Sequence, residues 1–83
     1  MTVIQTLEVE YFIEIIMKLN NNLFIGADRY RNINAFNIDK DFIITKKEIF
    51  RAHDNSVKYL TKFDDNKALS INYDGSVKLW EIN

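Results

Sequence analysis

Apolar residues recur at every second position along much of this chain, between short polar breaks. In the closing stretch SINYDGSVKLWEIN, Val77 and Leu79 alternate with Lys78 after an Asp-Gly pair. Such alternation is typical of a strand with one buried face, and the Asp and Asn clusters between the runs are typical of turns. The pattern predicts eight strands, at residues 2–8, 11–18, 23–27, 33–38, 42–50, 56–63, 68–73 and 76–82. The segment 8–19 also fits a helix, which is the alternative there.

The Asp74-Gly75 pair predicts a two-residue hairpin turn between the last two strands. Such turns need a positive φ at their centre, and an Asp-Gly pair adopts it readily.

The chain also repeats itself with a period in the mid-forties. At an offset of 44, Ile13, Ile16 and Leu19 align with Val57, Leu60 and Phe63, and Ile33, Phe36 and Ile38 align with Val77, Trp80 and Ile82. At an offset of 46, Leu23, Ile25 and Asp28 align with Leu69, Ile71 and Asp74. A repeat of this length with three or four strands per unit is typical of propeller blades.

The second unit, AHDNSVKYLTKFDDNKALSINYDGSVKLWE, resembles the WD-repeat β-propeller family. Ala52-His53 stands at the family's Gly-His, Asp74-Gly75 stands in its turn, and Trp80-Glu81 stands at its Trp-Asp. The resemblance implies an all-β fold of two four-stranded antiparallel WD-repeat-type blades, a partial β-propeller. The chain 1–83 is then one domain, with a degenerate first blade and its preceding outer strand at about 1–40 and a second blade at about 41–83.

The resemblance further implies that His53, Ser70, Asp74 and Trp80 form a buried chain of hydrogen bonds, from indole to hydroxyl to imidazole to carboxylate. The alternative is a nucleophilic triad of the hydrolase type, which is recognised by geometry and not by order in the chain. The chain has no Gly-x-Ser-x-Gly motif. We therefore expect a structural network and a protein that is not an enzyme.

The first unit lacks the polar residues of that network. Val9, Phe24 and Phe36 stand where His53, Ser70 and Trp80 stand in the second unit. We therefore expect apolar packing alone to hold the first blade together.

Composition removes several other classes of function. The chain has one His and no Cys, and Asp64-Asp65-Asn66 lacks the glycine and distal glutamate of a calcium loop, so we expect no metal and no cofactor. The net charge of −1 gives no electrostatic reason for binding nucleic acid or a membrane. Lysines interleaved with aromatic residues are therefore read as a solvated face, at Lys58, Lys62, Lys67 and Lys78.

The amino-terminal residues contain neither a signal peptide nor a membrane-spanning run, because glutamates interrupt them. The sequence predicts a cytoplasmic location, with the nucleus left open.

The function that the resemblance implies is a non-enzymatic scaffold for protein–protein interaction. Arg29, Tyr30 and Arg31 form the candidate partner contact, because Tyr and Arg are enriched in interface hot spots. The alternatives for the chain are a fragment of a larger propeller with no role of its own, a propeller piece that binds nucleic acid or a modified peptide, and a hydrolase. The alternative for residues 29–31 is a turn that simply faces solvent.

Two blades are too few to close a ring. The second blade lacks an outer strand, and residues 2–8 resemble one, so the expected partners are further copies of the chain or the missing blades of a larger propeller. An isolated copy is expected to expose a large apolar patch.

Overall fold

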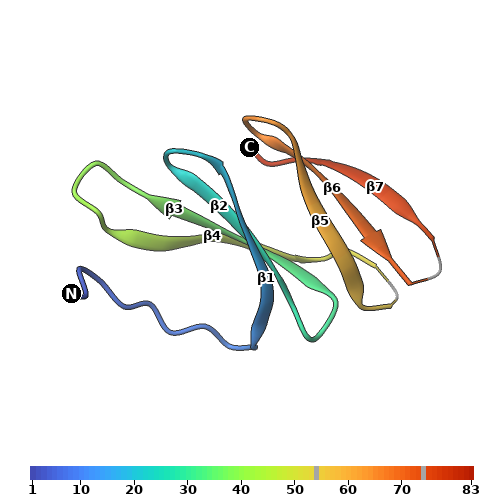
Figure 1. The fold of residues 1–83 in the computed structure, drawn as a ribbon, viewed down its shortest axis with the longest axis horizontal. Coiled ribbons are helices and arrows are strands. Elements are labelled where there is room, and N and C mark those ends of the chain that lie inside the picture. Colours follow the sequence, from blue (N-terminus) through green and yellow to red (C-terminus); the bar gives the residue numbers. More distant parts are fainter. Residues whose placement is uncertain (54, 74) are drawn as a thin grey trace.

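The computed structural model describes residues 1–53, 55–73 and 75–83. Its strands are β1 (Ile13–Asn20), β2 (Leu23–Asp28), β3 (Asn32–Ile38), β4 (Ile44–Arg51), β5 (Val57–Asp64), β6 (Lys67–Asn72) and β7 (Val77–Glu81). They pair antiparallel in a first sheet of order β1-β2-β3-β4 and a second sheet of order β5-β6-β7 (Figure 1). The all-β prediction is confirmed, and the helical alternative at 8–19 is wrong, because most of that segment belongs to β1.

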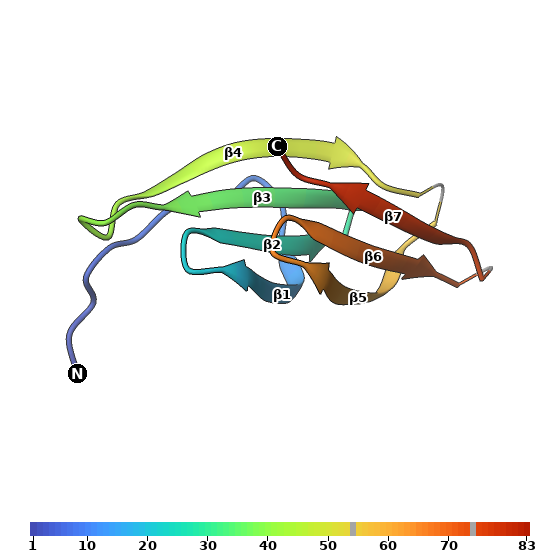
Figure 2. The ribbon, with the colours of Figure 1, turned by 90° about the horizontal axis from the view of Figure 1, so that it is seen from above.

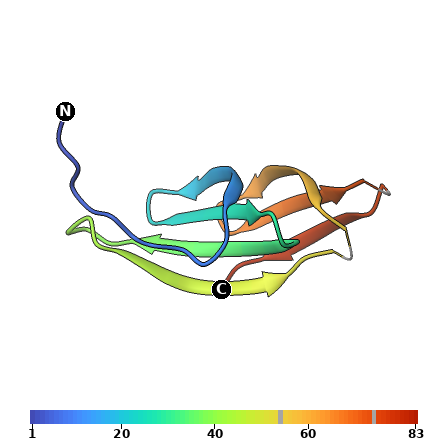
Figure 3. The same ribbon diagram turned by 90° about the horizontal axis from the view of Figure 1, so that it is seen from below.

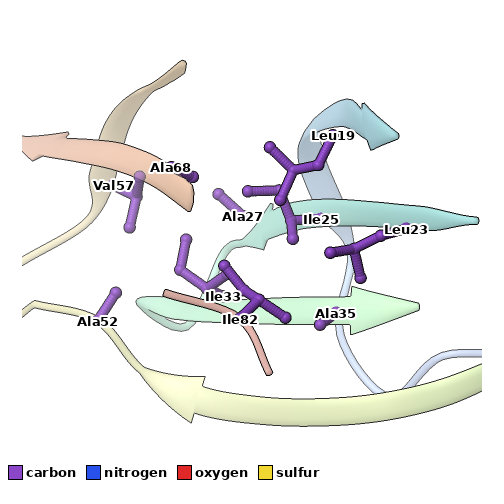
Figure 4. Packing of buried hydrophobic residues seen from close by; sticks show 10 residues of the cluster. All are labelled: Leu19, Leu23, Ile25, Ala27, Ile33, Ala35, Ala52, Val57, Ala68 and Ile82. Carbon is purple, nitrogen blue, oxygen red and sulfur yellow. The ribbon is translucent and has the colours of Figure 1, made fainter. Parts of the chain in front are cut away.

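The second sheet packs against one face of the first (Figure 2). Ten apolar residues from both sheets and their connections form the core between them: Leu19, Leu23, Ile25, Ala27, Ile33, Ala35, Ala52, Val57, Ala68 and Ile82 (Figure 4). Four of these ten residues are alanines, whose small side chains let the two sheets approach closely. The alternation in the sequence decides which side chains face this core, since successive residues of a strand point to opposite faces.

The amino-terminal segment, residues 1–9, forms no strand, so the prediction of a strand at 2–8 is wrong. The segment runs extended along the first sheet, at the opposite end of the molecule from β7 (Figures 1 and 3). The side-chain oxygen Oε1 of Gln5 accepts a hydrogen bond from the Ile44 backbone N–H at 3.1 Å. Leu7 and Val9 line a hollow together with Ile13, Ile16, Phe36 and Ile44, on the face of the first sheet that points away from the second.

The second sheet has three strands, fewer than the four of a complete blade, in agreement with the expectation that the second blade lacks its outer strand. A strand needs a partner edge for its backbone groups, and the unpaired edge of β7 lies beyond the reach of residues 1–9 of the same chain. Hydrogen bonding places β4, within the unit predicted at about 41–83, in the first sheet next to β3.

Strand β6 ends at Asn72, one residue before the end of the strand predicted at 68–73. Ile71 pairs with Val77, and the Asn72 N–H donates to the Ser76 carbonyl at 3.2 Å. Gly75 has a φ of +90°, a conformation that glycine adopts readily. Asp74 lies outside the described residues.

Gly26 marks a close approach between β2 and β1. A Cβ atom at this position would lie 2.7 Å from Ile13 Cγ2 and 3.2 Å from the Ile15 carbonyl oxygen. The β-branched Ile13 has little freedom to turn away. We expect Gly26→Ala to lower the free energy of unfolding by about 1–3 kcal/mol, as for an overpacked core.

Urea denaturation measures this loss. In the Ile13→Ala background the same change should cost much less, because the clashing methyl group is gone. An equal cost in both backgrounds would contradict the close approach.

Candidate functional site

A buried chain of hydrogen bonds joins three of the four residues predicted to form one. The Trp80 indole Nε1–H donates to Ser70 Oγ at 2.8 Å, and Ser70 Oγ lies 2.7 Å from His53 Nε2. Because the hydroxyl accepts from the indole, its own proton is available to an imidazole nitrogen that acts as acceptor. The fourth predicted member, Asp74, lies outside the described residues.

Burial decides what this chain can do. Ser70 is 0% exposed and His53 is 3% exposed. A nucleophilic hydroxyl has to reach a substrate atom, and this one is covered on all sides. The arrangement instead gives hydrogen-bond partners to buried polar atoms, which would otherwise weaken the fold.

Trp80 connects this chain of hydrogen bonds to the first sheet. Its ring lies 4.7 Å from the ring of Phe50 on β4, between centroids, at an angle of 46°. The neighbouring Lys78 donates from Nζ to the Ala52 carbonyl at 2.9 Å. The polar chain therefore ties β6 and β7 to the connection between the two sheets.

Removing the Ser70 hydroxyl leaves the Trp80 N–H without an acceptor inside the protein. We expect Ser70→Ala to lower the free energy of unfolding by about 2 kcal/mol, the cost of a buried polar group without a partner. Urea denaturation measures it, with Ser56→Ala, at an exposed serine, as the control that should stay within about 0.5 kcal/mol of the parent. Equal stabilities of the two variants would contradict the role of the network.

The first unit has a polar network of its own, contrary to the expectation of apolar packing alone. Asp28 is 2% exposed, and its carboxylate accepts four hydrogen bonds. Oδ1 accepts from the backbone N–H groups of Tyr30 at 2.8 Å and Asn32 at 3.1 Å. Oδ2 accepts from the side-chain amides of Asn32 at 3.1 Å and Asn34 at 3.0 Å. The expectation failed because it considered only the positions equivalent to His53, Ser70 and Trp80.

This carboxylate shapes the turn that contains the candidate partner contact, Arg29, Tyr30 and Arg31. The three side chains are exposed. Arg31 has a φ of 73°, a left-handed conformation that is strained for a residue with a side chain and that the surrounding hydrogen bonds must hold.

The chain before β1 also braces this turn. The Arg29 backbone N–H donates to the Phe12 carbonyl at 3.0 Å, and the Arg29 guanidinium lies 5.3 Å from the centre of the Phe12 ring. The rings of Tyr30 and Tyr11 lie 4.5 Å apart. The turn is thus exposed and held in one shape, which suits a recognition surface.

Two residues missed in the sequence join this surface. Arg29, Tyr30 and Arg31 line a hollow together with Arg51, from the end of β4, and Ser56, from the connection to β5. The repeat marks Asp28 in the sequence, because Asp28 aligns with Asp74. No sequence signal marks Arg51, because the pairing of β3 with β4 is what brings it beside the turn.

Loss of the Asp28 carboxylate should unlock this turn. We expect Asp28→Ala to lower the free energy of unfolding by about 3 kcal/mol, because buried amide groups lose a charged acceptor. The matched control is Asp39→Ala, an exposed turn carboxylate that accepts from the N–H groups of Asp41 and Ile43. Thermal and urea denaturation should show a clearly smaller loss for the control, and similar losses for both would contradict the role of Asp28.

The lysines read as a solvated face do not gather into a cationic patch. Lys62 pairs with Asp65 at 3.2 Å, and Lys67 pairs with Asp64 at 3.5 Å. Lys58 donates to the Tyr73 hydroxyl at 3.3 Å, and this hydrogen bond raises the pKa of Lys58 above its usual value.

The Asp64-Asp65-Asn66 turn is a hairpin turn. The backbone N–H of Asp65, and then the charge of Lys67, lower the pKa of the Asp64 carboxyl. Within the described ranges no group of three His, Asp or Glu side chains stands where it could hold a metal ion. The same residues include no helix long and apolar enough to cross a membrane.

The second sheet leaves its far face open. Four large apolar side chains on this face are more than half exposed: Tyr59 (62%), Phe63 (63%), Val77 (58%) and Leu79 (56%). We call this surface the open face. Its presence confirms the expected apolar patch.

No family model, curated protein or solved structure matches this chain.

Proposed function

We propose that this chain is a non-enzymatic scaffold for protein–protein interaction, a WD-repeat-type propeller piece that assembles with further copies of itself. The open face is the assembly surface. Its occupant is the outer face of the first sheet of a second copy.

The observation that carries the proposal is a difference between equivalent positions of the repeat. Phe63, Val77 and Leu79 are 63%, 58% and 56% exposed. The residues 44 positions earlier, Leu19, Ile33 and Ala35, are 0%, 1% and 0% exposed, because the second sheet covers them. The open face of the second sheet is thus equivalent, in the repeat, to the face of the first sheet that the second sheet buries.

The unpaired edge of β7 supports the same partner. The equivalent strand, β3, pairs with β4, with Ala35 opposite Glu48 and Ile33 opposite Phe50. Leu79 stands 44 positions after Ala35, and Ile4 stands 44 positions before Glu48. The same register therefore places Ile4 of one copy opposite Leu79 of the next. Residues 1–9 form no strand in the chain itself, and an extended segment adds readily to an open sheet edge.

The surface that such a copy presents is also apolar. On the outer face of the first sheet, Ile13, Ile16 and Phe36 line a hollow together with Leu7 and Val9, and Ile16 is 65% exposed. When residues 1–9 leave this face for the edge of a neighbour, these side chains become available to the neighbour's open face. Association thus replaces the contact of residues 1–9 with this face by packing against the second sheet of a neighbouring copy.

The buried Ser70 hydroxyl argues against the hydrolase alternative, since no substrate reaches it. Scaffold function needs only rigid surfaces, which the two polar networks and the shared core provide.

A charge on the open face tests this proposal. We expect the 83-residue chain to form a discrete oligomer and Leu79→Asp to dissociate it at least tenfold more readily, because a buried carboxylate opposes association. Light scattering after size-exclusion chromatography measures the mass, and Lys47→Asp on β4 is the control for added negative charge.

Cysteine cross-linking tests the register, because the chain has no cysteine of its own. Mixed copies carrying Ile4→Cys and Leu79→Cys should form a disulfide-linked heterodimer. Thr61→Cys is the matched control, since Thr61 lies on the same row of the sheet as Leu79 but on β5, two strands away. A monodisperse monomer would overturn the proposal, as would an aggregate without preferred cross-linking, in which case the missing cover belongs to other blades.

A further inference from the structure

The chain contains three arginines, and all three line one hollow. Arg29 and Arg31 come from the β2–β3 turn, and Arg51 comes from the end of β4. Tyr30 and Ser56 complete the lining of this hollow, which has a volume of about 380 Å³. The eight lysines of the chain all lie outside it. We call this surface the arginine hollow.

The backbone fixes the arginines beside one another. Arg51 pairs with Asn32, which directly follows Arg31, and the Ala52 N–H donates to the Arg31 carbonyl at 2.9 Å. The Asp28 carboxylate holds the turn from inside, and Phe12 lies against the Arg29 guanidinium. Three positive charges are therefore brought together on the hydrogen-bonded end of β4 and on the β2–β3 turn.

Among the described residues, the three arginines have no carboxylate partner. No carboxylate of these residues lines the hollow, and their salt bridges use lysines alone. Asp28, which directly precedes Arg29, is buried and directs its oxygens to amide groups of the turn and of β3. Three neighbouring guanidinium groups repel one another, and a bound anion relieves that repulsion.

We infer that the arginine hollow binds a phosphoryl group presented on a serine or threonine side chain of a partner peptide. A guanidinium has a planar fork of donors that matches phosphate oxygens, which a lysine ammonium does not offer. A phosphorylated side chain carries close to two negative charges and three acceptor oxygens, which suits three arginines better than one carboxylate does.

Tyr30 indicates a peptide and not a free ion. Its ring is 61% exposed and lies against Tyr11, so it offers a firm apolar surface beside the charges. Inorganic phosphate has no apolar part that could contact the Tyr30 ring, whereas a peptide has side chains beside its phosphoserine that can pack against this ring. This inference goes beyond the proposed assembly of copies, because it uses neither the open face nor the edge of β7.

The test is a titration of the full chain, followed by NMR, with the peptide Ala-Tyr-phosphoserine-Ala-Gly and with its unphosphorylated twin. We expect the phosphopeptide to bind at least tenfold more tightly than the twin, and inorganic phosphate to compete at least tenfold less well than the phosphopeptide. Arg51→Gln should weaken binding at least tenfold. Arg51→Lys should restore only part of it, because the charge returns without the fork.

Lys40→Gln is the matched control, since Lys40 is an exposed cation in the β3–β4 turn outside the hollow, and it should bind like the parent. Unchanged chemical shifts away from the hollow show that each variant is folded. Equal binding of peptide and twin, or an unaffected Arg51→Gln, would overturn the inference. Phosphate as good as the phosphopeptide, or a short single-stranded RNA that binds more tightly than either, would overturn the assignment to a peptide.

These outcomes stand apart from the assembly test. Leu79→Asp lies on the far face of the second sheet and should leave phosphopeptide binding unchanged, while Arg51→Gln should leave the oligomer intact.

Discussion

The packing of the second sheet on the inner face of the first is the contact on which this structure depends. A β-sheet with apolar side chains on both faces cannot stand alone in water, because each uncovered face costs free energy in proportion to its apolar area. The first sheet buries Leu19, Ile25 and Ile33 in this contact, and its own amino-terminal residues lie along part of its other face, where Ile16 stays 65% exposed. The second sheet has only one face covered, and the proposed association of copies follows from that imbalance.

Polar networks at the turns give this apolar packing a single register. A sheet whose strands slip by one residue turns every side chain to the wrong face, so an apolar core alone leaves the register poorly fixed. In the second sheet the hydrogen bonds among Trp80, Ser70 and His53 fix β7 against β6 and the incoming loop. In the first sheet Asp28 fixes the β2–β3 turn from within. The same network orders the turn that contains Arg29 and Arg31, so the stability of the turn and the shape of the proposed arginine hollow depend on one set of hydrogen bonds.

Much of this arrangement could be predicted from the sequence, and the failures have physical reasons. Local alternation and turn residues located β1 to β7 to within a few residues, because these signals act between neighbours in the chain. The resemblance to WD repeats predicted the hydrogen bond between Trp80 and Ser70, because a family pattern carries long-range information that local alternation lacks. The strand at 2–8 failed because a strand needs a partner edge, which no local pattern reports. Arg51 was missed for the same reason, because pairing of β3 with β4 brings it to the turn, whereas Arg29 and Arg31 were visible as neighbours.

Hydrogen exchange of the backbone amides at increasing protein concentration tests most directly whether a second copy covers the second sheet. The account predicts that protection rises with concentration along β7, from Val77 to Glu81, and along residues 2–7, while the amides of β2 and β3 keep the same protection at every concentration. Protection of β7 and of residues 2–7 that does not change with concentration would contradict the account.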